Sequence, residues 1–312
     1  MDELKVFSGN ANPSLARAVT EYLEIPLGKC EVFQFSNENI FVRILENVRS
    51  RDTFIIQPIS SPVNNSLVEL LIMIDALKRA SAGRITAVVP YYGYSRTDKK
   101  DQPRVPITAR LIADLLTVAG ANRLLTIDLH AAQIQGFFNI PVDELTALNI
   151  LGNYFKQKKL ENVVVVATDI GITKQARDLA HKLDAPLAIM EKRRIGNKDQ
   201  IETLNVIGEV EGRIALTVDD EIDTAGSLVN TVATLIERGA REVYACCTHP
   251  VFSGQAIQRI AASPVKEVVV TDTIPLNDGK KIDKITVLPI APLLGEAINR
   301  IHTGQSVGAL FE

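Results

Sequence analysis

Residues 214–228 read IALTVDDEIDTAGSL, an apolar run that passes into several carboxylates and then into small residues. The apolar start is typical of a buried strand in a parallel sheet, and the small residues Thr224 to Ser227 are typical of the first turn of a helix. The stretch therefore predicts a strand, a short acidic loop and a helix in direct succession, the unit from which α/β folds are built.

The chemistry of this loop suits a phosphorylated sugar. A helix start offers unpaired backbone N–H groups and the positive end of the helix dipole to a phosphate, and Gly226 allows close approach. Asp219 and Asp220 can accept hydrogen bonds from vicinal hydroxyls or hold Mg²⁺, and ligands of open α/β sheets bind at this edge of the sheet. The alternative is an acidic loop in which Asp223 only caps the helix.

Short runs rich in Val and Ile alternate with amphipathic stretches along the rest of the chain, which favours parallel sheets covered on both faces by helices. A helix ending at glycine and followed by a strand recurs in SAGRITAVVP, AGANRLLTIDLH and RGAREVYACCTHP, where glycine suits a left-handed C-cap. The predicted fold class is α/β, with two similar domains. The predicted strands are Leu4–Ser8, Thr53–Ile59, Arg84–Pro90, Arg123–Leu129, Val163–Asp169, Arg213–Val218, Glu242–Thr248 and Glu267–Thr273.

Composition narrows the class of protein. At 312 residues the chain has room for two domains. A net charge of −3 disfavours a nucleic-acid binder, and the absence of Trp disfavours a stacking platform. Cys30, Cys246 and Cys247 have neither the number nor the spacing of a disulfide framework or zinc site. We expect a cytoplasmic protein that is neither secreted nor membrane-spanning.

Two further stretches combine polar residues with a strand end. Residues 126–138, TIDLHAAQIQGFF, place His130 directly after a predicted strand, where a histidine is either a packing residue or a ligand. Residues 91–104, YYGYSRTDKKDQPR, form a turn-rich basic loop that either binds anions or is a solvated face.

Three shorter segments leave a similar choice open. Residues 191–194, EKRR, contain three consecutive cations. These cations either neutralise the charge on a phosphorus under attack or are ordinary surface residues. Residues 168–171, TDIG, are either a ligand loop or an ordinary turn after the VVVVA strand. In residues 33–40, FQFSNENI, Phe35 is either a core residue or part of a functional loop.

From end to end and in the same order, these motifs resemble those of the ribose-phosphate pyrophosphokinases. DLHAAQIQGFF closely resembles their DLH-x-x-Q-I-Q-G-F-F signature, and DTAGS resembles the D-T-G-G-T ribose 5-phosphate loop of the type I phosphoribosyltransferase superfamily. The resemblance implies a class I-like enzyme with two phosphoribosyltransferase-like domains. They would cover residues 1–147, joined by residues 301–312, and residues 148–300.

The implied reaction transfers the β,γ-diphosphoryl group of ATP to the 1-hydroxyl of ribose 5-phosphate, for nucleotide, histidine and tryptophan biosynthesis. It would yield phosphoribosyl pyrophosphate and AMP. Thr97, Asn39 and Ile172 depart from the residues usual in the family. By resemblance, Lys192 and Arg194 are catalytic; Phe35, Asn37, Asn39, Arg96, Thr97 and Asp101 bind ATP; Asp219, Asp220, Asp223, Thr224, Ala225, Gly226 and Ser227 bind ribose 5-phosphate; and His130 and Asp169 bind Mg²⁺.

The resemblance also implies a homo-oligomer, a hexamer built from dimers, with active sites shared between subunits. Arg49, Ser81, Gln135 and Ser306 resemble a regulatory site for phosphate and ADP, although Gly308 stands where Ser is frequent. No nucleic-acid or membrane partner is expected. Two rival hypotheses are a phosphoribosyltransferase, which shares the acidic loop, and a non-catalytic relative that serves only in assembly.

Overall fold

The computed structural model describes residues 3–193 and 203–310, which fold into two compact units. The N-terminal unit comprises Met1–Thr146, Thr273–Pro275 and Pro289–Glu312, and the C-terminal unit comprises Ala147–Asp272 and Leu276–Leu288. None of the helices within the described ranges combines the length and the apolar character that crossing a bilayer demands.

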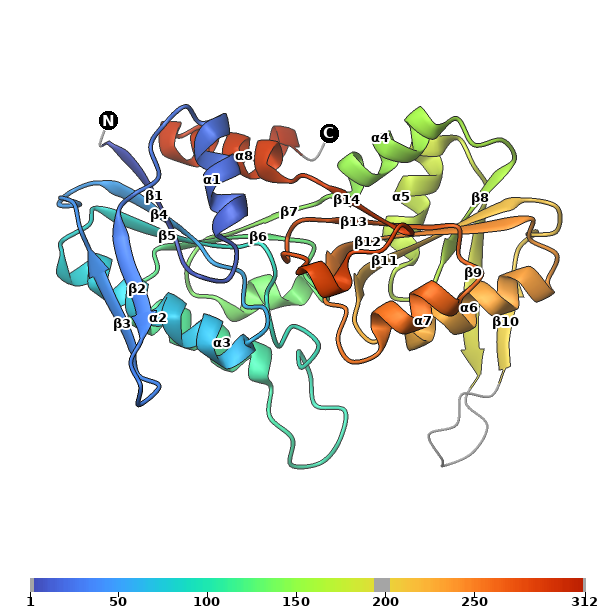
Figure 1. The fold of residues 1–312 in the computed structure, drawn as a ribbon, viewed down its shortest axis with the longest axis horizontal. Helices are drawn as coiled ribbons and strands as arrows, with labels where there is room; N and C mark the ends of the chain where they lie inside the picture. Colours follow the sequence, from blue (N-terminus) through green and yellow to red (C-terminus); the bar gives the residue numbers. More distant parts are fainter. Residues whose placement is uncertain (1–2, 194–202, 311–312) are drawn as a thin grey trace. The chain divides into compact units, whose positions relative to one another are not determined.

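The N-terminal unit is built on a parallel sheet in the order β1-β4-β5-β6-β7. Helices α2 and α3 lie on one face of this sheet, and α1 and α8 lie on the other (Figure 1). Because both faces are covered, every residue of the apolar strand β4 is buried. The strands are β1 (Leu4–Ser8), β4 (Asp52–Ile56), β5 (Arg84–Val89), β6 (Arg123–Ile127) and β7 (Val142–Leu145), and the helices are α1 (Pro13–Tyr22), α2 (Val63–Arg79), α3 (Thr108–Ala119) and α8 (Ala291–Thr303).

A hairpin of β2 (Cys30–Gln34) and β3 (Ile40–Ile44) forms a separate antiparallel sheet in this unit. Its residues Val32 and Val42 pack against the core beneath helix α2, whereas residues 35–39 form the exposed tip. Two short 3-10 helices complete the unit, η1 (Ala132–Phe137) and η3 (Gly308–Leu310).

The C-terminal unit has a larger sheet in the order β10-β9-β8-β11-β12-β13-β14, parallel except for β10. Helices α4 and α5 cover one face and α6 and α7 the other, each pair over its own hydrophobic core (Figure 1). The strands are β8 (Val163–Ala167), β9 (Leu187–Arg193), β10 (Thr203–Ile207), β11 (Ile214–Ile222), β12 (Glu242–Pro250), β13 (Glu267–Thr271) and β14 (Ile285–Leu288); the helices are α4 (Leu148–Lys158), α5 (Thr173–Leu183), α6 (Gly226–Glu237), α7 (Ala256–Ala262) and the 3-10 helix η2 (Asp278–Lys280).

The two units repeat one topology. Strands β1-β4-β5-β6-β7 have the same relative order as β8-β11-β12-β13-β14, and the hairpin β2–β3 corresponds to the antiparallel pair β9–β10. The units differ in that β9 joins the main sheet through β8, whereas β2 and β3 stand apart. The prediction of an α/β protein with two similar domains is therefore confirmed.

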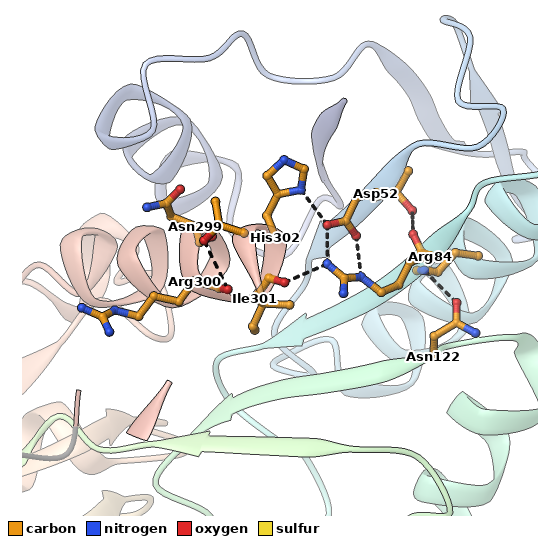
Figure 2. A network of polar contacts seen from close by, with 10 residues as sticks. Asp52, Arg84, Asn122, Asn299, Arg300, Ile301 and His302 are labelled. Atoms are coloured by element: carbon orange, nitrogen blue, oxygen red, sulfur yellow. Dashed lines mark hydrogen bonds and ion pairs between the residues drawn. The ribbon is translucent and has the colours of Figure 1, made fainter. Parts of the chain in front are cut away.

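Helix α8 belongs to the N-terminal unit, because a network of ion pairs and hydrogen bonds ties it there (Figure 2). Arg84 Nε donates to Asp52 Oδ1 at 2.8 Å, and Arg84 Nη2 donates to the carbonyl oxygen of Ile301 at 3.0 Å. His302 Nδ1 lies 2.8 Å from Asp52 Oδ2. The predicted second domain, residues 148–300, therefore ended too late: the chain returns to the N-terminal unit at Pro289.

The glycine cassettes are confirmed in two cases of three. Gly120 (φ 124°) and Gly239 (φ 85°) follow helices α3 and α6 with a positive φ. After α2, Ser81 (φ 62°) takes that conformation instead. Gly83 is required there by close approach, since an added Cβ would lie 3.0 Å from the carbonyl carbon of Ser50.

Candidate active site

The acidic residues of the C-terminal unit lie at the carboxyl end of β11 itself, which continues to Ile222, so the predicted strand, Arg213–Val218, ended too early and the predicted acidic loop is part of the strand. Asp219 Oδ2 accepts a hydrogen bond from Thr168 Oγ1 at 2.8 Å, and Asp219 Oδ1 accepts one from the backbone N–H of Asp220 at 3.0 Å. Thr168 follows β8, the strand that pairs with β11. The structure thus brings the predicted loop 168–171 and the predicted sugar-binding carboxylates to one sheet edge.

Burial raises the pKa of Asp219 well above its usual value, and the neighbouring Asp220 carboxylate adds to the increase. Asp220 is itself buried, with 6% of its surface exposed. The negative charge of the Asp169 carboxylate also raises the pKa of Asp219, by a smaller amount. The carboxylates of Asp169, Asp219 and Asp220 therefore repel one another when ionised, and hydrogen-bond donors or a bound cation would reduce this repulsion.

Residues 223–225 form the turn between β11 and helix α6, and Gly226 and Ser227 are the first residues of the helix. The N-cap of α6 is Ala225, which has a left-handed conformation (φ 59°, ψ 9°), and the helix start has no side-chain cap. The alternative in which Asp223 caps the helix is therefore wrong. A helix start without a side-chain cap leaves N–H groups directed toward an anion, as predicted for a phosphate site.

Two residues of the next strand connection hold this turn in place. Ser253 Oγ donates to Asp223 Oδ1, and the backbone N–H of Ser253 donates to the carbonyl oxygen of Asp223 at 3.0 Å. Arg259 Nη1, from helix α7, donates to the carbonyl oxygen of Thr224 at 2.8 Å. The sequence analysis missed both residues. Their position in the chain could have indicated them, because both follow β12, the strand that pairs with β11.

Asp169 lies in the turn between β8 and α5, and its side chain is exposed. Asp169 Oδ1 accepts a hydrogen bond from the backbone N–H of Ile172 at 3.2 Å, at the start of α5. Ile172, which departs from the residue usual in the family, is buried and packs in the hydrophobic core.

Of the two predicted catalytic residues, Lys192 falls on β9, which pairs with β10. Lys192 is paired with Leu204 in the backbone register. Arg194 lies outside the described residues. The pair β9–β10 is the topological counterpart of the hairpin β2–β3, so the two loops expected to handle ATP and the transferred group occupy equivalent connections.

In the N-terminal unit, the basic loop and the DLHAAQIQGFF segment meet. Gln133 Nε2 donates to Asp98 Oδ2 at 2.7 Å, and Asp98 is buried. Thr97 Oγ1 donates to the carbonyl oxygen of Tyr94 at 2.9 Å, which stabilises the turn. Arg96 and Asp101 are exposed on the same loop, and His130 is exposed at the end of β6. Asp98 and Gln133 join the two motifs, a role that the sequence analysis did not identify.

The tip of the hairpin β2–β3 carries an aromatic cluster. Phe35 is 48% exposed, and its ring centroid lies 5.1 Å from that of Phe33 and 5.8 Å from that of Phe41. Asn37 Oδ1 accepts a hydrogen bond from the backbone N–H of Asn39 at 3.2 Å. The alternative in which Phe35 is a core residue is therefore wrong.

The four residues of the predicted regulatory site all lie in the N-terminal unit. Arg49 forms an isolated β-bridge with Ala82, the neighbour of Ser81, and both Arg49 and Ser81 are exposed. Gln135 donates to Glu144 from helix η1, and Ser306 Oγ accepts from the backbone N–H of Gly308 at 3.1 Å. The structure brings Arg49 and Ser81 together, and the regulatory role stays a prediction.

Fold and site together define an α/β protein with clustered carboxylates and an uncapped helix start at the carboxyl edge of a parallel sheet. A family model for the N-terminal domain of ribose phosphate pyrophosphokinase matches residues 4–120, and one for the phosphoribosyl synthetase-associated domain matches residues 193–312. The chain belongs to the ribose-phosphate pyrophosphokinase family, a family of diphosphotransferases.

Individual relatives agree over nearly the whole chain. A ribose-phosphate pyrophosphokinase of Caldanaerobacter subterraneus is 56% identical over 99% of this chain and 98% of its own. That of Bacillus subtilis is 51% identical over 99% and 97%, respectively. The crystal structure of phosphoribosylpyrophosphate synthetase from Mycobacterium smegmatis has a TM-score of 0.93 and 43% identity, and it covers 97% of this chain and 100% of the other.

Proposed function

We propose that this chain transfers the β,γ-diphosphoryl group of ATP to the 1-hydroxyl of ribose 5-phosphate, giving phosphoribosyl pyrophosphate and AMP. The observation that carries the proposal is the succession, on one sheet edge, of two clustered carboxylates and an uncapped helix start, in a chain of this family. The carboxylates suit a ribose and the helix start suits its 5-phosphate.

Ribose 5-phosphate then binds along residues 219–227. The N–H groups of the turn and the hydroxyls of Thr224 and Ser227 surround the phosphate, while Asp219 and Asp220 accept hydrogen bonds from the ring hydroxyls. Asp223, Ala225 and Gly226 complete this loop. Arg259 supports the phosphate site indirectly, because its hydrogen bond to the Thr224 carbonyl fixes the turn before a ligand arrives.

ATP is held by Arg96, Thr97 and Asp101 of the basic loop. Its base is held by Phe35, Asn37 and Asn39 of a neighbouring subunit in a homo-oligomer, a hexamer of dimers. The 1-hydroxyl oxygen of ribose 5-phosphate attacks the β-phosphorus of ATP. The bond between the β-phosphorus and the α,β-bridging oxygen breaks, AMP leaves with that oxygen, and the hydroxyl proton is released. Lys192 and Arg194 stabilise the charge that develops on the transferred phosphates.

The residues present fit Mg²⁺. Asp169, Asp219 and Asp220 provide oxygen donors, and His130 is exposed in the other unit. Among residues 3–193 and 203–310, no three such side chains lie close enough to hold a metal by themselves. This suits Mg²⁺, which takes one or two protein ligands and completes its shell with water and phosphate. When bound, Mg²⁺ neutralises phosphate charge. Asp169 in the C-terminal unit and His130 in the N-terminal unit are each proposed to bind Mg²⁺.

Regulation and cellular setting follow as part of the same proposal. Phosphate and ADP act as effectors at Arg49, Ser81, Gln135 and Ser306. The enzyme works in the cytoplasm and supplies nucleotide, histidine and tryptophan biosynthesis.

The reaction is tested by incubating the full chain with ATP, ribose 5-phosphate and Mg²⁺, with and without inorganic phosphate. We expect AMP and phosphoribosyl pyrophosphate in equal amounts. Lys192→Ala should lower kcat by about 100-fold or more while the Kd for ribose 5-phosphate changes little, because the lysine acts on the transition state. Equal losses in kcat and in binding, or no loss, would reject that role. Absence of product despite ligand binding would favour the non-catalytic relative.

A further inference from the structure

A cavity of the C-terminal unit lies at the sheet edge opposite the turn between β11 and α6. Its volume is about 430 Å³, and its walls include residues directly before the parallel strands β8, β9 and β11. Phe155, Leu160 and Leu216 contribute an apolar floor. Four cations line it, Lys156, Lys159, Lys182 and Arg213, against one carboxylate, Asp184. Because the substrate loop follows β11 and this cavity precedes it, the two sites are distinct.

The cations are oriented without being neutralised. Lys182 Nζ donates to Asn149 Oδ1 at 3.1 Å, and Arg213 Nη1 donates to Asn162 Oδ1 at 3.0 Å. Both acceptors are neutral amides. Across residues 3–193 and 203–310, none of the four lining cations lies in an ion pair with a carboxylate. A cavity walled by uncompensated positive charge attracts anions.

The internal repeat offers a comparison for this arrangement. Arg51 directly precedes β4, as Arg213 directly precedes the equivalent strand β11. Arg51 forms an ion pair with Glu3, the residue before β1, at 3.2 Å, whereas Arg213 contacts Asn162, the residue before the equivalent β8. A carboxylate thus neutralises the guanidinium of Arg51 in the N-terminal unit, whereas the equivalent guanidinium of Arg213 has a neutral amide as its partner.

We propose that this cavity binds a small phosphorylated molecule with an aromatic or apolar ring. The phosphate lies against Lys156, Lys159 and Arg213, and the ring lies on the floor made by Phe155 and Leu216. A volume of about 430 Å³ is in the range of small-molecule sites. The proposal does not depend on the diphosphoryl transfer assigned to the opposite sheet edge.

Pyridoxal 5′-phosphate is a suitable probe, because it joins a phosphate to an aromatic ring. Its aldehyde condenses with a lysine amine with loss of water, and borohydride reduces the imine by hydride transfer to a stable amine. Peptide mapping of the full-length protein then locates the label. Pyridoxal, which lacks the phosphate, is the matched reagent, and the exposed Lys174 and Lys266 are internal controls.

We expect pyridoxal 5′-phosphate to label Lys156, Lys159 or Lys182 about tenfold more than the control lysines, and pyridoxal to show no such preference. Asn162→Asp restores the carboxylate found in the other unit and should lower this labelling about fivefold. Asn230→Asp, at an exposed position of helix α6, should leave it unchanged. Labelling that follows exposure equally with both reagents, or that Asn162→Asp does not alter, would overturn the proposal.

Discussion

Asp219 links the stability of the C-terminal unit to pH. Its pKa is raised by burial and by the adjacent Asp220 carboxylate. Between its unfolded and folded pKa values, the folded chain binds more protons than the unfolded chain, so the free energy of unfolding falls as pH rises through that window. The stability that protonated Asp219 contributes is therefore present at low pH and is lost as pH rises above its unfolded-state pKa, at the site where the sugar is proposed to bind.

Asp219→Asn should raise Tm at pH 7.5 by about 2–4 °C, because it replaces a buried ionisable group with a neutral one and keeps an oxygen acceptor for the Asp220 N–H. The gain should shrink toward pH 4, where the native carboxylate is protonated as well. Differential scanning fluorimetry across pH measures both effects. A Tm that is lower at every pH would contradict this description of the cluster.

Among single residues, sequence pattern identified those with a chemical reason to follow a strand end, such as Asp219 and Asp169. It missed Arg259 and Ser253, and it did not identify the contact of Asp98 with Gln133, because each acts through a hydrogen bond to a segment distant in the chain. It also gave no sign that Ala225 adopts a left-handed conformation, where glycine is usual.

At the scale of elements, the buried strands at the centre of the two sheets were predictable, whereas the separate hairpin, β9 and the edge strands were not. β8 reads as a continuous apolar run, VVVVA, and every residue of β4 is buried, as packing on both faces requires. The missed strands either are only four residues long, as β7 and β14 are, or contain charged or polar residues, so their sequences resemble loops. They are β2, β3, β7, β9, β10 and β14.

The hairpin β2–β3 has an exposed aromatic side chain, Phe35, at its tip, and this side chain contributes little to the stability of the fold. Phe35→Ala should change the free energy of unfolding by less than about 1 kcal/mol, since the side chain is 48% exposed. If the tip binds the adenine, the same substitution should raise the KM for ATP about tenfold or more, because stacking on the base is lost. Steady-state kinetics with ATP varied measures this change.

Val118→Ala, at a position 77% exposed on α3, is the control for loss of an exposed apolar side chain in the same unit. It should leave the KM for ATP unchanged. An unchanged KM for Phe35→Ala as well would remove the hairpin from the ATP site.

At the scale of the whole molecule, the repeated topology carries different chemistry at equivalent places. The segment after β4 is the N-terminal counterpart of the turn after β11. It lies next to the buried Glu69, whose Oε1 accepts a hydrogen bond from Gln57 Nε2 at 2.8 Å and whose Oε2 accepts one from Asn10 Nδ2 at 2.8 Å. A carboxylate repels a phosphate. The N-terminal counterpart is therefore less suited to the phosphate that is proposed to bind after β11.

The network around Asp52 joins the chain's last helix to its first unit. Arg84→Met should lower the free energy of unfolding by about 3 kcal/mol, because it leaves the buried Asp52 carboxylate without its guanidinium partner. Arg79→Met is the matched control: its exposed pair with Asp75 should contribute less than about 0.5 kcal/mol. Urea denaturation distinguishes the two, and equal effects would show that the network does not anchor α8.

The most direct test of the central claim follows the β-phosphorus of ATP. With β-³²P-labelled ATP, ribose 5-phosphate and Mg²⁺, the proposed transfer moves the label into phosphoribosyl pyrophosphate and leaves unlabelled AMP. Transfer of the γ-phosphoryl group alone would retain the label in ADP. Label found in ADP, or none in a ribose product, would contradict diphosphoryl transfer by this chain.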